Sequence, residues 1–118
     1  PVSALQYHIV CGTKYRHPML TGAVDVETKT ILAQTCTKYG WTLKAMEVMP
    51  EHVQLFIEAS PDNTPSSIAS TLKSISAVHI FTSFPKLKER KFWDPAYGPG
   101  DAITGVSVQS QRKAWKST

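Results

Sequence analysis

Residues 49–60, MPEHVQLFIEAS, have the pattern of a β-strand preceded by a tight turn at Pro50 and Glu51. Side chains of a strand point alternately to its two faces, so this segment divides into two rows. One row is apolar and consists of Val53, Leu55, Ile57 and Ala59. The other row is mostly polar and consists of His52, Gln54, Phe56 and Glu58. A sheet built on this strand would have one face suited to a core and one suited to solvent or a ligand.

The segments around this strand alternate between strand and helix patterns. Strands are indicated by β-forming residues, and helices by apolar positions at steps of three and four. Thr64 followed by Pro65 is typical of a helix start, with a capping hydroxyl and a proline in the first turn. The predicted order is strand 5–15, helix 24–39, strand 41–49, strand 52–59, helix 65–84 and, at 92–93, a fourth strand or its approach.

This β-α-β-β-α-β order predicts an α+β, ferredoxin-like (RRM-like) domain over residues 1–97, an antiparallel sheet with both helices on one face. Residues 98–118 are expected to form a divergent C-terminal tail that is weakly helical or loop. The helices would cover the apolar row and leave His52 and Gln54 on the open face. His8 could reach the same face, whereas Tyr7 and Tyr39 are expected in the core.

Composition restricts the class of protein. The chain has 118 residues, of which 42% are hydrophobic and 19% charged, which suits one domain. No apolar run approaches the roughly 20 residues of a membrane span, and no secretory leader is visible. Cys11 and Cys36 both lie in apolar patterns, which favours buried thiols in a reducing cytoplasm. The net charge of +4 permits a polyanionic partner.

His52 and Gln54 form a candidate metal site. Their i, i+2 spacing on a strand places an imidazole nitrogen and an amide oxygen side by side. These ligands suit a borderline-to-hard divalent ion such as Mg²⁺, Mn²⁺ or Co²⁺, which could polarise a phosphodiester for attack by a hydroxyl group. The alternative is a partly exposed strand on which both side chains are simply solvated.

The segment MPEHVQLFIE (49–58) resembles the M-P-D-H-x-H-L signature of the TnpA-type, single-tyrosine HUH transposases, the IS200-like transposase family. The similarity extends over residues 5–97. It includes YHIVCGTKYRHPML (7–20), TPSSIASTLKSISA (64–77), FPKLKERKFW (84–93) and DPAY (94–97) at the spacing of that family.

The resemblance implies a homodimer that acts on single-stranded DNA and recognises hairpins near the ends of an insertion sequence. A tyrosine attacks a phosphodiester to form a 5′-phosphotyrosine, while a divalent metal ion, Mg²⁺ or Mn²⁺, polarises the phosphate. His52 matches the first histidine of the signature. Gln54 stands at the second, where an amide oxygen can still ligate, more weakly than imidazole.

The nucleophile departs from the family pattern. The family places its tyrosine on a C-terminal helix, and no tyrosine follows Tyr97 in this chain. Tyr97 is therefore the candidate catalytic residue, with a packing role as the alternative. Two hypotheses stay open, an active transposase and a relic that binds hairpin or single-stranded DNA without cutting it. An RNA-binding sheet is a third, weakened because the central strands lack paired aromatic residues.

Positive charge and aromatic rings supply candidate DNA contacts, because phosphate neutralisation and base stacking provide affinity for single strands. The candidates are Lys14, Tyr15, Arg16, His17, Lys73, Lys86, Lys88, Arg90, Lys91 and Trp93. For each lysine the alternative is a solvated surface charge. Lys73 also matches a lysine that the family has in the same helix.

Overall fold

The computed structural model describes residues 4–89, 92–94 and 107–111. Its strands and α-helices follow the predicted β-α-β-β-α-β order, with two short 3₁₀ helices in addition. They are β1 (Ala4–Gly12), η1 (Lys14–Arg16), α1 (Gly22–Lys38), β2 (Thr42–Met49), β3 (His52–Ala59), α2 (Pro65–Ser83), η2 (Pro85–Glu89) and β4 (Ser107–Gln111).

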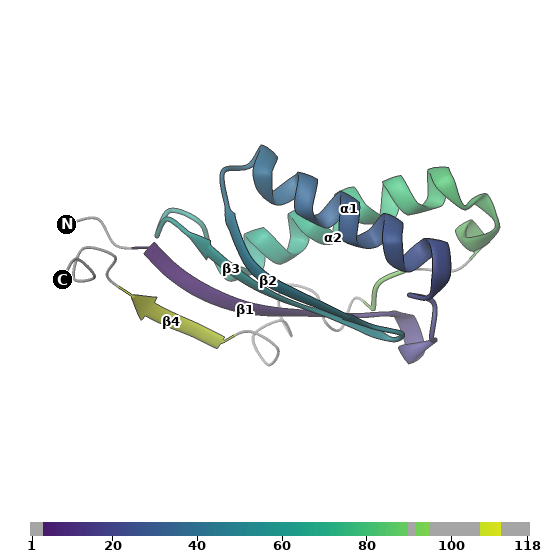
Figure 1. Cartoon of the computed structure of the whole chain (residues 1–118), viewed down its shortest axis with the longest axis horizontal. Helices are drawn as coiled ribbons and strands as arrows, with labels where there is room; N and C mark the ends of the chain where they lie inside the picture. Colours follow the sequence, from purple (N-terminus) through teal and green to yellow (C-terminus); the bar gives the residue numbers. More distant parts are fainter. Residues whose placement is uncertain (1–3, 90–91, 95–106, 112–118) are drawn as a thin grey trace.

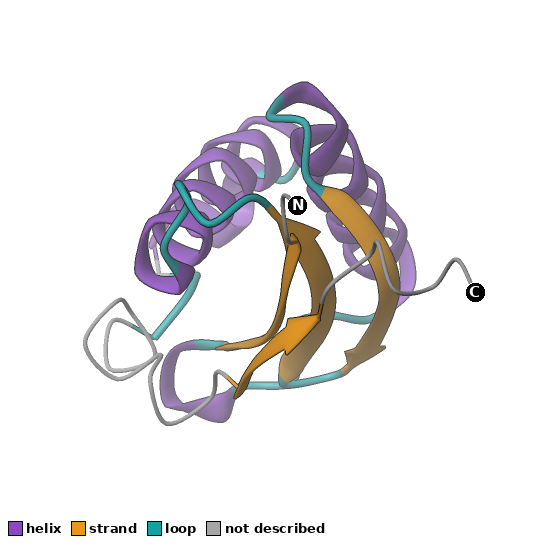
Figure 2. Cartoon of the chain, turned by 90° about the vertical axis from the view of Figure 1, so that its left-hand side faces the viewer, coloured by secondary structure: helices purple, strands orange, loops and turns teal. Residues whose placement is uncertain are grey.

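The four strands form one antiparallel sheet in the order β2-β3-β1-β4. Both α-helices of the described residues, α1 and α2, lie on the same side of this sheet (Figures 1 and 2). This arrangement confirms the predicted ferredoxin-like α+β fold. The turn at Pro50 and Glu51 also pairs β2 with β3 as a hairpin, with Met49 opposite His52.

The core lies between the sheet and the helices. Val53, Leu55 and Ile57 have no exposed surface, as the apolar row of β3 predicts. They pack with buried residues of both helices, among them Leu32 and Leu72. Strand β3 therefore packs against the core through only one of its two faces.

Both cysteines are free thiols in this core, which confirms their predicted burial. Burial raises the pKa of the Cys11 thiol to about 12 and that of Cys36 to about 11. The nearby Lys73 ammonium lowers the pKa of Cys11 but does not cancel the effect of burial. Both thiols therefore stay protonated near neutral pH.

The helix ends follow from local sequence. The Thr64 hydroxyl accepts a hydrogen bond from the Ser67 backbone N–H at 3.0 Å, which satisfies one of the free donors at the start of α2. Gly40 follows α1 with a φ of +75°, a left-handed conformation that glycine adopts without strain.

Tyr39 does not lie in the core as predicted. It is the C-terminal cap of α1, 47% exposed, and stacks on Trp41 with ring centroids 5.0 Å apart. The chain leaves the helical path at this cap, so the periodicity that placed Tyr39 on the buried stripe no longer applies. Trp41, 6% exposed, enters the core instead.

The tail differs from the weak helix or loop that the sequence predicts. Residues Ser107–Gln111 form β4, which pairs antiparallel with residues 4–8 of β1. The physical reason is tertiary: the outer edge of β1 presents unpaired backbone groups, and a strand satisfies them whatever its weak intrinsic preference. The fourth strand is therefore not at 92–93, where Trp93 makes only an isolated bridge to Thr13.

Candidate functional site

The open face of the sheet brings His8 of β1 against the polar row of β3. The His8 Nε2 atom lies 2.9 Å from the Gln54 Oε1 atom, a hydrogen bond between neighbouring strands. The His8 ring also stacks on Phe56, with centroids 4.3 Å apart and an angle of 11° between the planes. This confirms that His8 reaches the open face. The row is open from His52 to Phe56 only, because Glu58 is buried.

His52 lies at the start of β3, directly after the turn. Its Nδ1 atom is buried, makes no hydrogen bond to any residue that the structure describes, and lies 3.5 Å from the Glu51 carboxylate. Metal-binding histidines commonly direct one ring nitrogen to a carboxylate and ligate with the other. The Nε2 atom of His52 and the amide oxygen of Gln54 are thus a donor set that fits a divalent cation.

The acidic surroundings of this pair are sparse. Glu47 on β2 is exposed and lies opposite Gln54 in the sheet. Among the described residues, no group of three or more His, Cys, Asp or Glu side chains converges as a complete metal centre. A cation held by His52 and Gln54 would therefore complete its coordination with water or with ligand oxygens.

A basic loop follows β1 at the same end of the sheet. Tyr15 is 74% exposed, and the Lys14 Nζ atom lies 4.8 Å from the centre of its ring. Tyr15 and Arg16 both adopt positive φ values, 57° and 56°. Each such residue costs roughly 1–2 kcal/mol in an L-amino acid, and backbone strain of this kind often marks a binding or catalytic site.

Thr13 ties this loop to the turn that carries Glu51. Its hydroxyl lies 2.7 Å from the His17 carbonyl oxygen and 3.1 Å from the Glu51 carbonyl oxygen, and its backbone N–H donates to the same Glu51 oxygen. Thr13 is fully buried. The predicted contacts Lys14, Tyr15, Arg16 and His17 are therefore held next to the candidate metal residues. Nothing in the local sequence pattern indicates this anchor.

The sequence predicts that Trp93 stacks on bases, but its side chain is not available for stacking. It is 7% exposed, and its indole N–H donates to the Ser76 hydroxyl at 2.9 Å. Burial of so large an aromatic surface stabilises the core, so the indole is more stable buried than exposed to solvent. Lys73 is half-buried: its ammonium donates to the Asp94 carbonyl oxygen, and desolvation lowers its pKa.

The remaining predicted residues divide by what the structure describes. Lys86 is exposed on η2. The side chains of Lys88, Arg90, Lys91 and Tyr97 lie outside the described part of the chain, as does the proposed boundary at residues 97 and 98.

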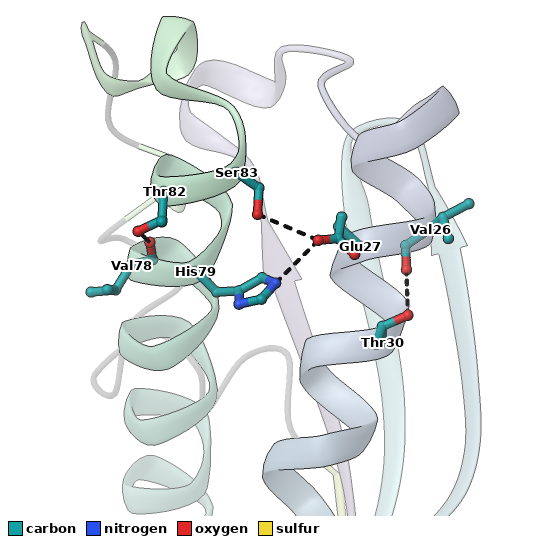
Figure 3. A network of polar contacts seen from close by, with 7 residues as sticks. All are labelled: Val26, Glu27, Thr30, Val78, His79, Thr82 and Ser83. Atoms are coloured by element: carbon teal, nitrogen blue, oxygen red, sulfur yellow. Dashed lines mark hydrogen bonds and ion pairs between the residues drawn. The ribbon is translucent and has the colours of Figure 1, made fainter.

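The helical layer has a separate polar cluster (Figure 3). The His79 Nε2 atom lies 3.2 Å from the Glu27 Oε2 atom, and the Ser83 hydroxyl donates to the same oxygen at 3.4 Å. The hydroxyl is thus bonded to the carboxylate. A nucleophilic triad would instead require a hydrogen bond from the hydroxyl to the imidazole. The cluster ties α2 to α1, beside a shallow groove lined by Ile31, Ser74, Ile75, Val78, His79 and Thr82.

The sheet topology, the signature-bearing turn and the open polar face together define a small α+β protein with its site on a bare sheet. Residues 1–112 match the family model described as "Transposase IS200 like". The chain belongs to this transposase family. None of the described helices is long and apolar enough to cross a lipid bilayer.

Individual relatives and solved structures support this family assignment. The chain is 37% identical over 115 residues to the ISDra2 transposase TnpA of Deinococcus radiodurans, covering 98% of this chain and 82% of the relative. A crystal structure of a Deinococcus radiodurans protein described as a transposase superposes with a TM-score of 0.73 at 32% identity, covering 99% of this chain and 86% of that one. A REP-associated tyrosine transposase bound to a REP hairpin shares the fold, with a TM-score of 0.58 at 18% identity over 62% of its length.

Proposed function

We propose that this transposase cleaves and rejoins single-stranded DNA at the ends of an insertion sequence. The observation that carries the proposal is the end of the open face, where His52 and Gln54 lie beside a basic loop anchored by Thr13. Lys14 and Arg16 attract phosphates, and the exposed ring of Tyr15 offers a surface on which a base can stack. DNA binding in this arrangement does not need the paired aromatic residues that RNA-binding sheets carry on their central strands.

His52 and Gln54 would hold a divalent cation, Mg²⁺ or Mn²⁺, through an imidazole nitrogen and an amide oxygen. When bound, this cation supplies electrostatic stabilisation of the scissile phosphate. Glu51 orients the His52 ring by facing its Nδ1 atom. The basic loop holds the strand and fixes the position of the phosphate relative to these side chains.

The nucleophile proposed from the sequence is Tyr97. Its hydroxyl oxygen attacks phosphorus as the bond from phosphorus to the 3′ oxygen breaks. The 5′-phosphate becomes linked to tyrosine, and the leaving 3′ oxygen takes up a proton equivalent to the one the tyrosine loses. Attack by a 3′-hydroxyl on this link reverses the step and joins two strands, so no nucleotide cofactor is consumed.

The proposed partners are hairpins in single-stranded DNA and a second copy of the chain, acting in the cytoplasm. A related fold bound to a REP hairpin supports a hairpin ligand. Size-exclusion chromatography with light scattering would test the homodimer, and a monomer at micromolar concentration would argue against it.

The decisive experiment is a denaturing gel that detects a covalent adduct between protein and DNA. Purified protein is incubated with Mn²⁺ and single-stranded DNA from the element ends, beside the variants Tyr97→Phe, Tyr15→Phe and His52→Ala. We expect an adduct that needs His52 and Tyr97. An adduct lost only in Tyr15→Phe would move the nucleophile to the basic loop. Retained DNA binding with no adduct under any condition would identify a relic that has lost cleavage.

A further inference from the structure

Gln54 lies between two imidazoles along the open face. His8 is paired across the sheet with Phe56, Gln54 with Val10 and His52 with Gly12, so the three polar side chains follow one another along the β1–β3 pair. His8 leans along this row to contact Gln54 and not its direct partner alone. Gln54 therefore has His8 on one side and His52 on the other.

The hydrogen bond between His8 and Gln54 has a defined direction. With the amide oxygen facing the ring, as the structure places it, the His8 Nε2 atom carries the proton and donates it, because an amide oxygen only accepts. A protonated nitrogen has no free lone pair, so His8 cannot ligate a cation through this atom. Stacking on Phe56 fixes the plane of the His8 ring, and with it the direction of the N–H bond.

Gln54 needs such a partner more than a histidine would. The terminal torsion of a glutamine side chain is broad, and its amide can present either an oxygen or an NH₂ group to a neighbour. Only the oxygen can bind a cation. A donor that holds the oxygen in place therefore lowers the cost of arranging the amide for ligation, and the oxygen keeps a second lone pair for the metal.

We propose that His8 is a positioning residue for the metal site, holding the Gln54 amide so that its oxygen faces a cation shared with His52. This inference rests on the metal-binding part of the proposed function. It gives each ligand an outer partner: Glu51 for His52 and His8 for Gln54. Outer partners of this kind typically contribute a factor of about 10–100 to metal affinity.

The test is Mn²⁺ affinity, measured without DNA by electron paramagnetic resonance of the free ion. His8→Phe removes the donor and keeps a ring that can stack on Phe56. We expect His8→Phe to weaken Mn²⁺ binding about 10-fold or more in the wild-type background. In a Gln54→Ala background the same change should have no further effect, because the residue acts only through Gln54. In a Gln54→His background it should have a smaller effect than in the wild type.

Wild-type affinity in His8→Phe would overturn the inference, and so would an equal loss in the Gln54→Ala background, which would make the His8 effect independent of Gln54. No Mn²⁺ binding, or binding unchanged in His52→Ala, would remove the metal step of the proposed function and this inference with it. Should His8→Phe fail to fold, the tautomer decides the matter: ¹⁵N spectra of wild-type histidines should show a proton on His8 Nε2, and its absence would overturn the inference.

Discussion

The two faces of β3 show how one strand serves two purposes. On the covered face, Val53, Leu55 and Ile57 have no exposed surface. On the open face, Phe56 is 40% exposed, and His52 and Gln54 are partly exposed. Both faces share one backbone, so the difference comes from the side chains and from what covers them.

The covered face of β3 therefore contributes to stability, and the open face carries the polar groups of the candidate site. Apolar burial contributes roughly 25 cal/mol for each Å² removed from water, and that contribution falls on the covered face. The open face is then free to hold polar groups whose partners are only partly satisfied, such as the buried Nδ1 atom of His52. Substitutions on the two faces should therefore change different measurable quantities.

The largest contrast is between adjacent residues. Leu55→Ala should lower the free energy of unfolding by about 2–5 kcal/mol, because it leaves a cavity in the core. Gln54→Ala should lower it by no more than about 1 kcal/mol, since it removes one partly exposed hydrogen bond. Urea unfolding followed by circular dichroism measures both. Equal losses would show that the open face also supports the fold.

Thr13 connects the basic loop to the turn that carries Glu51. Loss of its hydroxyl should lower the free energy of unfolding by less than loss of a core leucine side chain. Thr13→Val keeps the shape and removes the hydroxyl donor, while the His17 and Glu51 carbonyl oxygens each keep a backbone N–H donor, so it should cost about 0.5–1.5 kcal/mol of unfolding free energy. Thr82→Val is the matched control: its hydroxyl donates to the Val78 carbonyl oxygen on an exposed helix surface, so we expect a change within about 0.5 kcal/mol. Similar values for both would argue against the anchor.

Core burial also predicts a dependence on alkaline pH. The folded pKa of Cys11 is raised to about 12 from an ordinary 9.0, so above pH 9 the unfolded chain loses the proton first. Stability from this thiol is complete below pH 9 and declines as pH rises toward 12, by about 1.4 kcal/mol per pH unit. Urea midpoints between pH 8 and pH 10 should fall more steeply in the wild type than in Cys11→Ala. Parallel profiles would contradict the prediction.

A small stability change of opposite sign is expected in the basic loop. Tyr15→Gly relieves a positive φ and should raise the free energy of unfolding by about 1 kcal/mol or less. The same change should weaken single-stranded DNA binding by about 1–3 kcal/mol through lost stacking. Fluorescence anisotropy with a labelled oligonucleotide measures the second effect. Tyr39→Ala removes another exposed tyrosine, on the helical layer, and should leave DNA affinity unchanged.

Local patterns predicted the residues whose environment depends on their own periodicity. The alternation in β3 separated the core row from the polar row, and Thr64-Pro65 marked the start of α2. Periodicity misplaced Tyr39, because the helix ends one residue before it. The aromatic ring of Trp93 suggested base stacking, but its burial depends on contacts with Ser76 and Phe92. The strand at Ser107–Gln111 was missed because it forms against an edge of β1, which lies about a hundred residues earlier.

The sequence by itself determined the ferredoxin-like fold, the family, and His52 and Gln54 as neighbours on one face. It could do so because strand alternation and helix periodicity are local, and the signature lies within ten consecutive residues. Only the tertiary structure decided which groups surround that pair. The contacts of His8 with Gln54 and of Thr13 with Glu51 join residues 46 and 38 positions apart, and register between strands is set by the packing of the whole sheet.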